Sequence, residues 1–73
     1  MNYELKEIRK EAKDLGLSTK LTIEKDSQDY YTVTGGGYSS WNPLIDSTWF
    51  ESVTEARTEA IKELISRHEE ESN

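Results

Sequence analysis

The sequence predicts an α+β domain with its elements in the order helix, strand, strand, strand, helix (α-β-β-β-α). Residues 2–15 and 51–67 each repeat apolar side chains at spacings of three and four, which is typical of amphipathic helices. Residues 21–34 lie between them and either alternate or are rich in β-branched and aromatic side chains. We expect a three-stranded antiparallel sheet with two helices packed on one face.

The length limits the number of domains. Seventy-three residues bury only about 60% of their unfolded surface and leave room for one core. We therefore expect a single α+β domain over residues 1–68, followed by a disordered acidic tail over residues 69–73, which has no apolar anchor. Cysteine is absent, so disulfides and cysteine-ligated zinc are excluded.

The first helix is expected from Asn2 to Leu15. Asn2 can cap its N-terminus, and Gly16 should end it in a left-handed conformation, with Leu17 in apolar contact with the last turn. We interpret the mixed Lys, Arg and Glu side chains as a solvated face. The apolar face consists of Leu5, Ile8, Ala12 and Leu15.

A β-hairpin is expected next, with strands at residues 21–25 and 30–34 and a turn at residues 26–29. Alternation places Tyr31 and Val33 toward the core. The open face of the sheet then carries Tyr30, Thr32 and Thr34.

Residues 35–47, GGGYSSWNPLIDS, form an unusually long connection to a short third strand at residues 48–50. In an alternative interpretation, residues 38–41 and 44–46 extend the flanking strands around an Asn42-Pro43 turn. In either case, alternation allows only one of the two aromatic residues of the third strand to enter the core. These residues are Trp49 and Phe50.

The last helix begins with Ser52 as N-cap and Glu55 three residues later, the spacing of a capping box. Four glutamates repeat every four residues and form one stripe, in which each neighbouring pair costs about 0.2–0.5 kcal/mol. Lys62 and Arg67 offset part of this repulsion. The stripe consists of Glu51, Glu55, Glu59 and Glu63.

The sequence contains no recognisable catalytic or cofactor site. The three glycines lack the Lys and Ser or Thr of a phosphate-binding loop, and the single His68 has no Cys or second His beside it. We expect neither an enzyme nor a metal or cofactor site, and we interpret His68 as a helix-end residue. The longest apolar run is two residues, so we expect no membrane partner and a cytoplasmic protein.

The net charge of −6 favours a basic protein partner and disfavours direct binding to nucleic acid. Residues 1–20 carry +1, residues 21–50 carry −3 and residues 51–73 carry −4. Trp41, in a polar stretch, either contacts a partner or folds back on its own sheet. The expected partner-binding residues are Tyr30, Tyr38, Trp41, Asp46, Glu51, Glu55, Glu59 and Glu63.

The order of elements resembles the double-stranded-RNA-binding domain, but residues 51–55 read ESVTE where that family has a basic cluster. In size, charge and lack of cysteine, the chain also resembles the small acidic proteins that bacteriophages use against host nucleic-acid machinery, including anti-CRISPR proteins. The second resemblance implies an inhibitor that occupies the basic groove of a nucleic-acid-binding complex in the host cytoplasm. The chain would then act as a monomer or a homodimer.

Two alternatives remain open. The aromatic sheet face and the loop could self-associate, which would make the chain a structural or assembly protein. The first helix could instead bind nucleic acid directly, as in an RNA-binding module. The basic residues available for this are Lys6, Arg9, Lys10 and Lys13.

Overall fold

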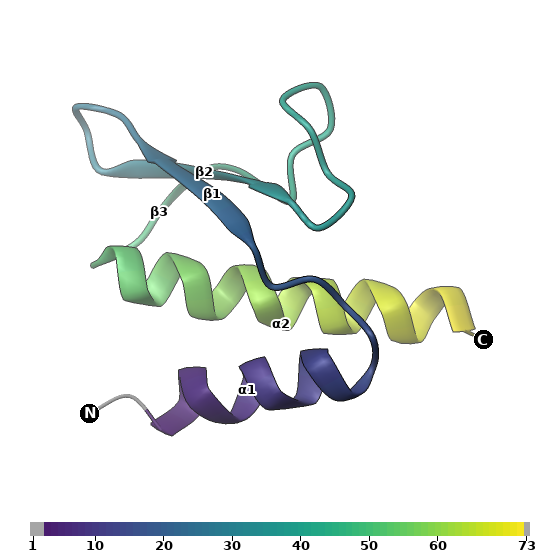
Figure 1. Cartoon of the computed structure of the whole chain (residues 1–73). Helices are drawn as coiled ribbons and strands as arrows, with labels where there is room; N and C mark the ends of the chain where they lie inside the picture. The colour runs from purple at the N-terminus through teal and green to yellow at the C-terminus, as the bar shows by residue number, and fades with distance from the viewer. Residues whose placement is uncertain (1–2, 73) are drawn as a thin grey trace.

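Five elements follow one another in the predicted order in the computed structural model, which describes residues 3–72 (Figure 1). They are α1 (Tyr3–Asp14), β1 (Leu21–Lys25), β2 (Tyr30–Gly35), β3 (Ile45–Trp49) and α2 (Val53–Ser72). The three strands form one antiparallel sheet in the order β1-β2-β3. The predicted fold class is therefore confirmed.

Both helices lie on the same side of the sheet, and α2 lies between the sheet and α1 (Figure 1). This stacking follows from apolar residues on two sides of α2. Ala60 and Leu64 pack against Val33 of the sheet, whereas Ile61 and Ile65 pack against α1. We expected both helices to cover the sheet; α1 instead packs mainly on α2.

The hairpin has the predicted strands and facing. Ile23 lies opposite Val33 in the β1–β2 register, and the side chains of Tyr31 and Val33 are buried. The turn is closed by Asp26, whose carboxylate oxygen Oδ1 accepts hydrogen bonds from the backbone N–H groups of Gln28 and Tyr30 at 2.8 and 3.0 Å. This is the local role for which Asp is favoured in turns.

The third strand begins earlier in the chain than the expected range, residues 48–50. It starts at Ile45 and contains a bulge, since the register shifts between Tyr31 and Val33 of β2. Ser47 adopts a φ of 46° in this bulge and donates its N–H to Thr32 Oγ1 at 3.2 Å.

Only one of the two adjacent aromatic residues at the end of β3 enters the core, as alternation predicts. Phe50 is buried, and its ring meets that of Tyr31 edge-on, with 5.9 Å between the centroids. Trp49 faces outward opposite Tyr30.

Two successive tight turns form the connection between β2 and β3. Gly35 and Tyr38 exchange backbone hydrogen bonds of 2.9 and 3.1 Å across Gly36-Gly37, and both of these glycines have positive φ. Residues 39 and 42 likewise exchange bonds of 3.0 and 3.3 Å across Ser40-Trp41. A long connection between β2 and β3 is therefore present, but it consists of ordered turns and is shorter than expected, because β3 begins at Ile45. The alternative turn at Asn42-Pro43 is wrong, since the chain reverses at Gly36-Gly37 and at Ser40-Trp41.

The C-terminus of α1 has the predicted glycine stop. Gly16 adopts a φ of 80°, and Leu17 donates its N–H to the carbonyl of Ala12 at 2.9 Å. The N–H of Gly16 donates a second hydrogen bond, also of 2.9 Å, to the carbonyl of Lys13, and the two bonds together form a Schellman motif. The expected Asn2 cap lies outside the described residues.

The N-terminus of α2 has the expected cap in a slightly shifted form. Ser52 Oγ accepts the N–H of Glu55 at 3.2 Å, as predicted. The carboxylate of Glu55 accepts the N–H of Glu51 at 2.7 Å, one residue earlier than in the standard box.

α2 is longer than expected. It continues to Ser72, so residues 69–72 are helical, where we had expected the disordered tail, and His68 lies within the helix. No Gly or Pro interrupts the chain after Ser52, and Glu is a good helix former. Asn73 lies outside the described residues.

Two glycines of the loop allow a matched test of its conformation. Gly35 has a φ of 105°, and a Cβ added there would lie 2.7 Å from the carbonyl oxygen of Lys20; Gly37 has a φ of 97° and open space around it. We expect Gly37→Ala to lower the free energy of unfolding by about 1–2 kcal/mol. Gly35→Ala should cost at least about 1 kcal/mol more because of the backbone clash. Urea denaturation measures both, and equal losses would contradict this geometry.

Candidate functional site

The tip of the loop presents a nearly fully exposed tryptophan. The side chain of Trp41 is 95% exposed in the turn closed by residues 39 and 42. Figure 1 shows this loop, in teal after β2, rising from the sheet on the side away from α2. Of the two outcomes expected for Trp41, folding back on its own sheet is therefore excluded.

The base of the loop is fixed to α2 through Tyr38. The Arg67 guanidinium carbon lies 4.8 Å from the centroid of the Tyr38 ring, and Arg67 Nε donates to Glu63 Oε2 at 2.8 Å. The polar interaction with Tyr38 is the largest influence that raises the pKa of Arg67 above its ordinary value, and the interaction with Glu63 is the second largest. The Tyr38 ring also packs against the buried cluster that includes Leu64.

Two of the predicted contact residues therefore have partners inside the chain. Tyr38 is half-buried and supports the loop, and Glu63 is paired with Arg67. The sequence indicated that Arg67 would offset part of the charge of the glutamate stripe. It did not indicate the contact between Arg67 and Tyr38, because these two residues are far apart along the chain and meet only when the loop lies against α2.

The uncovered face of the sheet carries a second aromatic group. Tyr30 and Trp49 lie opposite each other on β2 and β3 and are 39% and 57% exposed. Asp46 is also exposed, and it lies on β3, three residues before Trp49. Trp49 was absent from the predicted contact residues, since alternation alone did not decide whether Trp49 or Phe50 would face outward.

Three glutamates of the expected stripe gather with one from α1. Glu51, Glu55 and Glu59 line a depression of about 300 Å³ together with Glu4. Lys62 partly neutralises this group, because it forms ion pairs with Glu4 and, at 3.6 Å, with Glu59. The hydrogen bond from Lys62 to Glu4 is the largest contribution that raises the pKa of Lys62 above its ordinary value.

The described residues offer no cluster of side chains suited to a metal ion. Within residues 3–72, no group of three or more His, Cys, Asp or Glu side chains could hold a metal ion. Over the same residues, no helix combines the length and apolar character needed to cross a bilayer. The expectation that the chain is not an enzyme stays a prediction.

No family model, no curated protein and no solved structure matches the chain. The two resemblances described above therefore remain hypotheses, and the functional argument rests on the geometry of this chain.

The clamp between Tyr38 and Arg67 should stabilise the loop. Arg67→Ala removes a cation–π contact of about 0.5–1 kcal/mol and an ion pair of about 0.2–0.5 kcal/mol, so we expect a loss near 1 kcal/mol in urea denaturation. In a Trp49→Phe background, the fluorescence anisotropy of Trp41 should fall as the loop loosens. Arg67→Lys is the control, because it keeps the charge and should retain part of both effects; unchanged anisotropy in Arg67→Ala would contradict the clamp.

The pKa of Lys62 offers a test of the link between α1 and α2. Glu4→Gln should lower this pKa toward the ordinary value of about 10.4, as followed by NMR titration of the Lys62 side chain. Glu59→Gln should lower it less, because Glu59 contributes less to the shift. Since the folded-state pKa is raised, the pair stabilises the fold below about pH 10.4 and its contribution is lost as the pH rises through the folded-state value. A larger effect of Glu59→Gln would contradict the assignment.

Proposed function

We propose that this chain is a non-enzymatic protein-binding module that docks on a basic protein through Trp41. The observation that carries the proposal is the exposed indole at the tip of a structured turn. Burying a tryptophan removes about 150–250 Å² from water, worth about 4–6 kcal/mol before the costs of association. A side chain of this size left in water is typical of an interface anchor.

The turn is organised in advance of binding. Its backbone is closed by paired hydrogen bonds at both Gly36-Gly37 and Ser40-Trp41, and Arg67 holds its base. A partner therefore meets Trp41 in a defined position and loses little free energy in ordering the loop. This supports a binding role for the turn.

The charge of the chain favours a cationic partner. The net charge is −6, and the acidic group around Glu51, Glu55 and Glu59 is only partly neutralised by Lys62. Such a surface accelerates encounter with a positively charged groove. We therefore propose a nucleic-acid-binding protein as the partner, with inhibition by occupation of its groove, as in phage-encoded inhibitors acting in a host cytoplasm.

A second candidate function is self-association through the uncovered sheet face. It is favoured by the pairing of Tyr30 with Trp49, which leaves two partly exposed rings side by side on β2 and β3. Sedimentation velocity at several concentrations distinguishes this function, because Trp49→Thr should abolish a dimer while Trp41→Ala leaves it intact.

The test of the lead proposal is affinity capture from a bacterial host lysate, followed by competition with the captured protein. We expect Trp41→Ala to lose the basic partner and Trp49→Phe to retain it, since Trp41 is almost fully exposed and Trp49→Phe keeps an aromatic ring opposite Tyr30. The purified partner should release labelled DNA or RNA when the native chain is added, less so as salt rises. Lys substitutions at Asp46 and Glu51 should weaken this competition. Equal capture by native and Trp41→Ala chains would contradict the proposal.

A further inference from the structure

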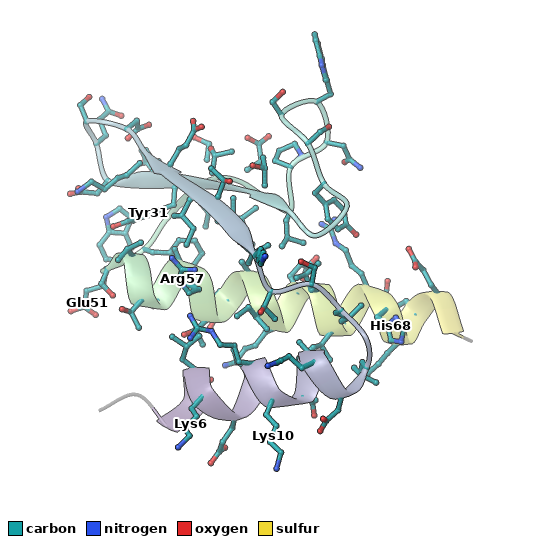
Figure 2. All side chains as sticks on the ribbon, viewed as in Figure 1. Lys6, Lys10, Tyr31, Glu51, Arg57 and His68 are labelled. Carbon is teal, nitrogen blue, oxygen red and sulfur yellow. The ribbon has the colours of Figure 1, made fainter. Side chains whose placement is uncertain are left out.

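A row of four cations follows the outer surface of α1. The four residues occupy the i, i+3, i+4 and i+7 positions of the helix and extend over about 10 Å along its axis. All four are exposed, and Figure 2 shows Lys6 and Lys10 pointing away from α2. We call this set the α1 cation row; its members are Lys6, Arg9, Lys10 and Lys13.

No member of the α1 cation row forms an ion pair with another described residue. The ion pairs among residues 3–72 involve Lys25, Lys62 and Arg67, and none involves a member of the row. Like charges at spacings of three and four destabilise a helix. The chain therefore maintains a concentrated positive surface despite its net charge of −6.

The fold separates this row from part of the acidic surface. Glu4 of α1 turns toward Lys62 and joins Glu51, Glu55 and Glu59 around the depression between the helices, while the row lines a different, shallow depression on α1. α1 and the loop that bears Trp41 lie on opposite sides of the molecule, with α2 between them (Figure 1). A ligand of the row would thus leave the proposed Trp41 interface free.

We propose that the α1 cation row binds the phosphate backbone of a single-stranded nucleic acid without sequence preference. Three lysines and an arginine in a line match the repeated charges of one strand. Leu5 is the one apolar side chain that lines the same depression, and it is half-buried in its packing against α2. With four cations and a single half-buried leucine, this surface suits a diffuse contact with phosphates better than a protein interface.

The inference goes beyond the proposed function and depends on a different surface. Together, the Trp41 loop and the α1 cation row would allow the chain to contact both components of a complex between a basic protein and nucleic acid. At physiological salt, charges beyond about 8 Å are largely screened, so a strand along α1 responds chiefly to the nearest charges.

The test is fluorescence anisotropy of a labelled oligouridine titrated with the full chain alone. Full use of the four cations gives a salt slope near −3, so the affinity should fall about 50-fold between about 50 and 200 mM salt. The double variant Lys6→Glu and Lys10→Glu should weaken binding by about tenfold or more at the lower salt.

A matched control reverses two other exposed lysines, Lys20→Glu and Lys25→Glu, and changes the net charge by the same amount. We expect it to weaken binding by less than about threefold, because distant charges are screened. Circular dichroism checks that both variants fold. Equal weakening by the two variants would overturn the proposal, as would the absence of binding by the native chain at about 50 mM salt.

The same experiments would reveal two other possible ligands of the α1 cation row, a membrane and a second copy of the chain. Binding to phosphatidylserine-containing vesicles without binding to oligouridine would assign the row to membranes, and a dimer lost only in the α1 row variant would assign it to a second copy. Either result overturns the proposal. Trp41→Ala should leave oligouridine binding unchanged, so failure here is distinguishable from failure of the protein-binding function.

Discussion

The packing of α2 between the sheet and α1 is the constraint on which the rest of this structure depends. α2 meets the sheet through small or branched side chains such as Ala60 and Leu64, and it meets α1 through Ile61 and Ile65. A domain of this size has little apolar surface to bury, and α2 contributes apolar side chains to the core on both sides. The arrangement leaves one sheet face and the outer surface of α1 uncovered (Figure 1).

The same helix determines what the β2–β3 loop presents to solvent. Leu64 packs with the Tyr38 side chain, and Arg67 covers its ring, so the base of the loop belongs to the folded core. Trp41, three residues further on, lies beyond that support and is exposed. An anchored base beneath an exposed aromatic tip is an arrangement that binding proteins use to limit the entropy lost on association.

Charge is also distributed by tertiary packing. The contact between α1 and α2 brings Glu4 to Lys62 and the N-terminal glutamates of α2. The cations on the outer side of α1 remain without an ion-pair partner among the described residues. A single value of net charge therefore describes this molecule poorly: it has separate surfaces of both signs, which is consistent with a role where protein and nucleic acid meet.

The sequence by itself determined the order of the elements, the hairpin facing, the glycine stop after α1 and the Ser52 cap, because each depends on a few neighbouring residues and on the periods of helix and strand. The period of a strand also required that only one of the adjacent residues Trp49 and Phe50 be buried. Only the tertiary structure decided that Phe50 enters the core, that Trp41 stays exposed, that Tyr38 supports the loop and that α1 packs on α2. These outcomes depend on contacts between residues far apart in the chain, whose energies no local pattern contains.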